Sequence, residues 1–149
     1  MKLRRKNSCQ RGSFIRKKIV KLLVDTSILI ALLASEEERN KIIQKIDGSE
    51  LVCVESIKLE MGNALSAMFK KRRITLQQGL DILQAFQKIK IHIVPIDLFR
   101  SIEISHQYNI YAYDAYVLEA AKHLNISLIT LDNKMKEIAQ KIKIPVIEV

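Results

Sequence analysis

The 149-residue chain contains no tryptophan and has few glycines (four), prolines (two) and cysteines (two). Cys9 lies in a basic N-terminal stretch and Cys53 in an apolar run, and no C-x-x-C pair occurs. This argues against a disulfide framework and against a thiolate zinc site. The three histidines, His92, His106 and His123, do not have the spacing of metal ligands either. Aromatic residues make up only 5% of the chain, so we expect a core built mainly from isoleucine and leucine.

Long hydrophobic runs are absent as well. The apolar run Ile28–Ala34 is far shorter than the roughly 20 residues that cross a bilayer as a helix. Lys21 and Asp25 interrupt the apolar part of the N-terminal region, and the following LLASEEE has no clean small-residue cleavage site. We therefore expect a cytoplasmic protein with no secretory signal and no membrane association.

Charge is distributed unevenly along the chain. Nine of the 25 Lys and Arg residues lie within residues 1–21, where there is no acid, which leaves 16 basic residues against 16 acidic ones in the rest. We interpret residues 1–18 as a basic extension and residues 19–149 as one domain. The extension has two interpretations: a disordered segment or misassigned start, or an arm attracted to phosphate groups.

Short apolar segments alternate with longer amphipathic ones after residue 18. We expect strands at 19–24, 50–54, 90–96, 126–131 and 145–149, because these runs are apolar on both faces. Helices are expected at 26–34, 35–46, 55–73, 75–88, 97–108, 111–124 and 132–142, with Ser27 and Ser35 as N-caps of the first two. Buried strands separated by helices predict an α/β fold, a three-layer sandwich with a central parallel sheet of about five strands.

Four acidic residues fall where such a sheet places ligands, beyond the carboxyl ends of its strands. Asp25 and Asp132 follow predicted strands, Asp114 lies near the start of a helix, and Glu60 lies inside a helix among apolar neighbours. Taken singly, each aspartate is more simply explained as a helix N-cap, and Glu60 as the exposed edge of its helix. Independent caps, however, have no reason to gather at one edge of the sheet.

The electrostatic cost of such a cluster suggests a cation. Two carboxylates about 5 Å apart repel by roughly 3 kcal/mol at an effective dielectric constant near 20. Several of them in one pocket must take up protons or bind a cation. A site made of oxygen ligands, with no histidine or cysteine, suits Mg²⁺ or Mn²⁺. The reaction class that such a site favours is phosphodiester hydrolysis.

The stretches LLVDTSILIALL, SIKLEMGNAL, YDAYVLEAAKHLNISLITLD and PVIEV resemble the PIN domain, and in particular the VapC-type toxin ribonucleases. The likeness covers roughly residues 20–149. It implies that Asp25, Glu60, Asp114 and Asp132 are the catalytic, metal-binding acids of an Mg²⁺- or Mn²⁺-dependent endoribonuclease. Further residues are implied to support the acids: Thr26, Ser27, Asn63 and Glu119. The resemblance also implies an RNA substrate, a homodimer and a cognate antitoxin.

Other functions stay open from the sequence. A non-catalytic RNA-binding module with the PIN shape would explain the basic extension, and a PIN nuclease could act in RNA processing without an antitoxin. A phosphatase with Asp25 as nucleophile ranks last, because the second aspartate that such enzymes need two residues later is replaced by Ser27.

Overall fold

The computed structural model describes residues 19–35 and 37–149, and within them the chain forms five strands and seven helices. The strands are β1 (Lys21–Val24), β2 (Glu50–Val54), β3 (Ile91–Val94), β4 (Ser127–Ile129) and β5 (Val146–Ile147). The helices are α1 (Thr26–Leu33), α2 (Arg39–Ile46), α3 (Ile57–Lys70), α4 (Leu76–Lys88), α5 (Leu98–Tyr108), α6 (Ala112–Leu124) and α7 (Asn133–Lys141). The predicted extension, residues 1–18 with Cys9, lies outside the described residues.

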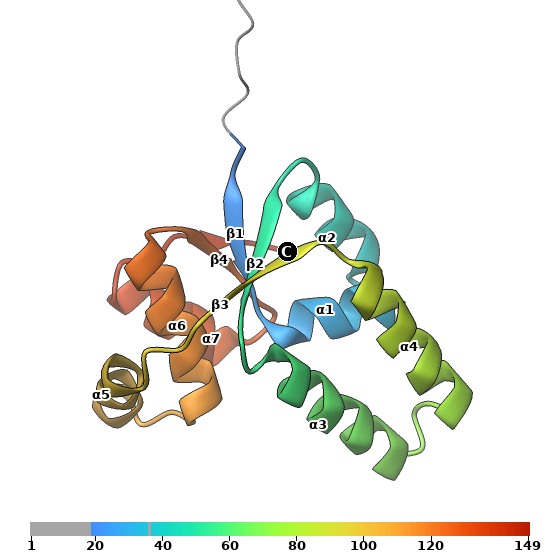
Figure 1. The fold of residues 1–149 in the computed structure, drawn as a ribbon. Helices are drawn as coiled ribbons and strands as arrows, with labels where there is room; N and C mark the ends of the chain where they lie inside the picture. Colours follow the sequence, from blue (N-terminus) through green and yellow to red (C-terminus); the bar gives the residue numbers. More distant parts are fainter. Residues whose placement is uncertain (1–18, 36) are drawn as a thin grey trace, which may run out of the picture.

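The five strands form one parallel sheet in the order β3-β2-β1-β4-β5. β1 is therefore the central strand, with Leu23 opposite Val52 on one side and Leu128 on the other. Helices cover both faces: α1 to α4 lie on one side of the sheet and α5 to α7 on the other (Figure 1). The predicted α/β sandwich with about five parallel strands is confirmed.

Successive side chains of the central strand β1 point to opposite faces of the sheet, which explains the two helical layers. Leu22 and Val24 point into the core beneath α1, α2 and α3, while Leu23 between them points into the core beneath α6 and α7. All three side chains are at most 2% exposed. Strands that bury both faces need helices on both sides, which fixes the sheet as the middle layer. No helix of the described residues is both long and apolar enough to cross a membrane.

The second helix begins later than the sequence predicts. Ser35 was expected to cap it, but Ser35 has φ +56, a left-handed conformation, whereas an N-cap residue is normally extended. The helix starts at Arg39 instead, and its N-cap Glu38 makes no side-chain capping bond. The prediction for Ser35 was therefore wrong.

The strand predicted at 126–131 is also shorter, because β4 ends at Ile129. The next two residues leave the sheet to make other bonds: the Thr130 hydroxyl donates to Asp25, and the Leu131 amide donates to Ser27. The end of this strand is thus used by the site rather than by the sheet.

Candidate functional site

Asp25 lies at the carboxyl end of the central strand, where the chain turns into α1. Its backbone N–H still bonds to Ile129 O on β4, at 3.2 Å. Its Oδ2 atom accepts three bonds, from Ser27 N (3.3 Å), Ser27 Oγ (2.7 Å) and Thr130 Oγ1 (3.0 Å). No described residue donates to Oδ1. The carboxylate is therefore held through one oxygen while the other stays available.

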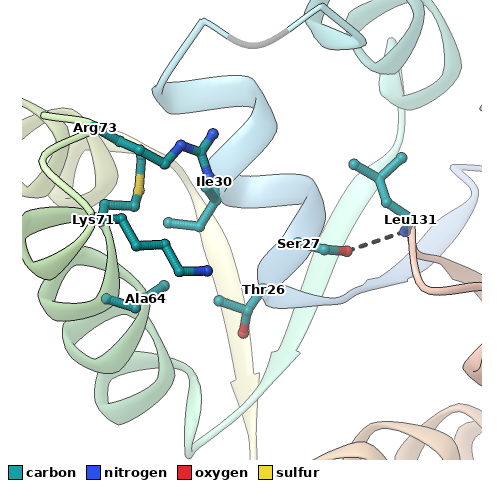
Figure 2. A pocket seen from close by; sticks show the side chains of 9 residues that line it. Thr26, Ser27, Ile30, Ala64, Lys71, Arg73 and Leu131 are labelled. Carbon is teal, nitrogen blue, oxygen red and sulfur yellow. Dashed lines mark hydrogen bonds between the residues drawn. The ribbon is translucent and has the colours of Figure 1, made fainter.

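The N-cap of α1 is Asp25, so the prediction that Ser27 caps this helix was wrong. Both residue types cap well, and the extended backbone of Asp25 decides between them. The Ser27 hydroxyl instead joins two segments, because it donates to Asp25 and accepts from Leu131 N at 3.1 Å (Figure 2). Ser27 thus acts as a brace between the β1–α1 and β4–α7 turns.

Glu60 reaches the same place from α3, through hydroxyl groups. Thr26 Oγ1 donates to its Oε2 at 2.7 Å, and Ser56 Oγ donates to its Oε1 at 2.6 Å. Because Thr26 follows Asp25 directly, the first bond ties Glu60 to the neighbourhood of Asp25. The pKa of the Cys53 thiol is raised to about 12, first by burial and then by the negative charges of Asp25 and Glu60. Both acids therefore lie near this thiol.

Asp114 and Asp132 complete the group from α6 and α7. Asp132 caps α7 through Oδ1, which accepts from Met135 N at 2.9 Å. Asp114 lies in the first turn of α6, and its carboxylate takes no hydrogen bond from the described part of the chain. Burial, and then Asp132, Asp25 and Glu60, raise the pKa of Asp114 to about 6, while Lys134 opposes them. The other three acids therefore all act on Asp114.

Two of the expected supporting residues make no hydrogen bond to the four acids. Asn63 is exposed on α3 and makes no hydrogen bond to a described residue. Glu119 is buried against α5, where its Oε1 lies 4.0 Å from Arg100 Nη1. Burial raises the pKa of Glu119, and the charges that also act on it are those of His123, Asp97 and Arg100 rather than those of the four acids. The structure therefore does not place Glu119 beside the four acids.

Two hydroxyl residues in the site were missed from the sequence. Thr130 is fully buried; it donates to Asp25 and accepts from Asp132 N at 3.0 Å, so it links two of the acids. Ser56 holds Glu60 from four residues earlier. The available signals were a hydroxyl two residues before Asp132 and another one helical turn before Glu60.

The donor chemistry of this group suits a hard divalent cation. The four acids bring carboxylate oxygens only, and several of these oxygens accept no bond from a residue that the structure describes. No three carboxylate, imidazole or thiol groups within residues 19–35 and 37–149 are placed to hold one ion together. Mg²⁺ normally keeps several waters and takes one or two carboxylates directly, with other acids bonding to those waters. Four acids that lie near one another without converging on one point fit that kind of binding.

Comparison with solved structures finds the same fold in several proteins. VapBC2 from Rickettsia felis, solved on a DNA fragment from its promoter, has a TM-score of 0.62 at 15% identity, with 86% of this chain and 98% of that chain covered. A toxin–antitoxin complex from Klebsiella pneumoniae has a TM-score of 0.60 at 20% identity, covering 85% and 96%. VapC20 from Mycobacterium tuberculosis, a toxin that cleaves the sarcin–ricin loop, has a TM-score of 0.58 at 12% identity, covering 78% and 94%.

These identities are low, and the similarities show the fold alone. No curated protein sequence matches the chain. The family model described as the PIN domain matches residues 22–141, which is most of the chain and includes all four acids. The chain belongs to the PIN domain family.

Proposed function

We propose that this protein is an endoribonuclease that depends on Mg²⁺ or Mn²⁺, and that it is the toxin of a toxin–antitoxin pair. The observation that carries the proposal is the gathering of Asp25, Glu60, Asp114 and Asp132 at one end of the sheet, where three of them raise the pKa of the fourth. A protein that needed only to fold would gain nothing from this repulsion. A protein that binds a cation there recovers the cost.

We assign a role to each acid. Asp25, Glu60 and Asp114 would hold the cation, and Asp132 would help with a second ion or orient the attacking water. When bound, the cation would neutralise charge on the phosphate and make a bound water more acidic. Thr26, Ser56, Ser27 and Thr130 hold the carboxylates in place through the bonds described above. Such fixed carboxylates need little rearrangement when the ion and substrate arrive.

The reaction is an in-line hydrolysis. The oxygen of water forms a bond to the phosphorus and the water gives up one proton, while the bond from phosphorus to the 3′ oxygen breaks and the leaving oxygen takes up one proton, so that one water is consumed. The products are a 5′-phosphate and a 3′-hydroxyl. End-group analysis of cleaved RNA checks this polarity, because a 2′,3′-cyclic phosphate cannot arise from attack by water.

Asp25→Asn and Asp114→Asn test the proposal directly. Metal-assisted stabilisation is worth several kcal/mol, so each variant should cut RNA at least about 100-fold more slowly with Mg²⁺ or Mn²⁺. Asp47→Asn, at an exposed turn after α2, is the matched control and should cut like the parent chain. Unchanged cleavage by both site variants would sink the proposal. RNA binding in EDTA with no cleavage under any metal would favour a non-catalytic binding module instead.

The proposed partners are an antitoxin, a second copy of the chain and RNA. Support for the antitoxin comes from the fold that the chain shares with proteins solved as toxin–antitoxin complexes. A small neighbouring reading frame for a DNA-binding protein with a C-terminal tail is the expected genetic observation. Copurification of the two gene products tests the pairing, and the molar mass in solution tests the homodimer. If this chain cuts RNA and no antitoxin gene or protein accompanies it, a role in RNA processing is favoured instead.

A further inference from the structure

A groove of about 330 Å³ lies between α1 and the end of α3, next to Asp25 and Glu60. Thr26 and Ser27 line it at the acidic end, and these are the residues that bond to Glu60 and Asp25. Lys71 and Arg73, which follow the last residue of α3, also line it, and no carboxylate is among its nine lining residues. The charged side chains that line the groove are therefore all cations, and the acids lie just beyond Thr26 and Ser27.

The floor of the groove is low because of the residues on one face of α3. Ala64 and Ala67 follow Glu60 at spacings of four and seven residues, so all three lie on the same side of the helix, and Lys71 follows Ala67 by four. Small side chains between the acid and the cation leave space for a chain to lie along the helix. Figure 2 shows the ammonium end of Lys71 directed along this space toward Thr26.

The basic residues at the end of α3 could be present only because they stabilise the helix, and their positions distinguish this explanation from a role in binding. The basic run is Lys70, Lys71, Arg72 and Arg73, and the helix dipole stabilises the cations nearest the helix end, Lys70 in the last turn and Lys71 at the C-cap. Only Lys71 and Arg73 of these four line the groove. Lys71 is exposed and forms no ion pair with a described residue, while its backbone N–H is fixed by a bond to Ala67 O at 3.1 Å.

We propose that this groove binds the RNA strand next to the cleavage point, and that Lys71 contacts a backbone phosphate there. The inference rests on the proposed RNA substrate. A cluster of four acids repels a polyanion, so a strand needs cations close by to bring the scissile phosphate to the site. Phosphate contacts fix the position of a nucleic acid without reading its sequence, and a neutral floor accepts the sugar and base. Lys71 is accordingly a positioning residue.

Binding of RNA can be measured without cleavage in the full-length Asp25→Asn chain with Mg²⁺. The probe is a short fluorescent single-stranded RNA of mixed sequence, and anisotropy gives Kd at several salt concentrations. Lys71→Gln should weaken binding about 5- to 10-fold at low salt, the size of one charged hydrogen bond reduced by solvent exposure. The slope of log affinity against log salt should fall by about 0.7, one phosphate contact on a single strand.

Lys70→Gln is the matched control, because it removes the same charge from the adjacent residue, which does not line the groove. It should change Kd less than 2-fold, roughly the effect of a distant surface charge. Lys71→Arg should bind RNA like the parent chain. Unchanged melting temperatures in all three variants exclude a folding defect.

Equal affinities of the Lys71→Gln and Lys70→Gln variants for RNA would overturn the inference and leave the groove to another occupant, such as a protein segment. Failure of the nuclease proposal looks different. In that case the Lys71 effect on Kd persists, but the parent chain cuts no RNA with either metal. In an active enzyme, Lys71→Gln should raise KM more than it lowers kcat and leave the metal concentration for half-maximal rate unchanged.

Discussion

Asp114→Asn should stabilise the metal-free protein, although it removes a residue of the proposed site. Asp114 is half-buried in the first turn of α6, and its carboxylate takes no hydrogen bond from the described residues. Burial and the charges of Asp132, Asp25 and Glu60 disfavour its ionised form. Asparagine keeps the shape of the side chain and removes the charge, so the repulsion disappears while the packing stays.

The size of this gain follows from the pKa. A rise from 3.8 to about 6 corresponds to about 3 kcal/mol at 1.36 kcal/mol per tenfold change. The side chain is only half-buried, so solvent screens part of this energy, and we expect a gain of about 1–2 kcal/mol. In the parent chain the folded state holds the proton longer than the unfolded state as the pH rises. Stability is therefore lost between about pH 4 and pH 6, and the loss is complete above that range.

Urea unfolding in EDTA at about pH 4 and about pH 7.5 measures the effect. The free energy of unfolding of Asp114→Asn should exceed that of the parent chain only slightly at the lower pH, and by the whole expected gain at the higher pH. Asp47→Asn provides the control, because it removes a charge far from the cluster. Added Mn²⁺ should stabilise the parent chain more than the variant, so the difference between their free energies of unfolding should become smaller. Equal stability at both pH values, or a gain that is larger in acid, would refute the reasoning.

Two other changes test the residues beneath the carboxylates. Thr130→Val removes the donor to Asp25 and the acceptor for Asp132 N, so the free energy of unfolding should fall by about 1–3 kcal/mol and RNA cleavage should slow. Thr130→Ser should restore both stability and cleavage. A Thr130→Val chain as stable and as active as the parent would contradict this role of Thr130. In a Cys9→Ser chain, Cys53 should resist maleimide until the protein unfolds, because it is buried and its pKa is about 12. Labelling of folded protein at the rate of a free thiol would show that the sheet is open at this point.

The order of helices and strands could be predicted from the sequence because their signals are strong and local. The buried strands are continuous apolar runs, and Thr75 and Asp97 cap their helices as their sequence positions suggest. The position of β1 between β2 and β4 was not predicted. It depends on which strands pair over long sequence distances, and no local pattern records that pairing.

The site was only partly predictable, for a related reason. Asp25 and Ser27 are both good caps, and the choice between them depends on backbone angles rather than residue type. The geometry of Asp25 as an N-cap leaves room for the proposed cation, because Oδ2 caps the helix and Oδ1 carries no bond from a described residue. Glu119 lies a little over one turn beyond Asp114, and only the packing of α5 on α6 shows which way it faces.

The position of β4 beside β1 also sets when the site can form during synthesis. β1 closes on β4 only after Ile129 is made, and Asp25 receives its bond from Thr130 across 105 residues of chain. Asp114 and Asp132 both come from the last quarter of the sequence. A nascent chain therefore carries at most two of the four acids until Asp114 is made, and all four only after Asp132. The site cannot form before β4 has been made and has paired with β1, so its assembly depends on a contact between distant parts of the sequence.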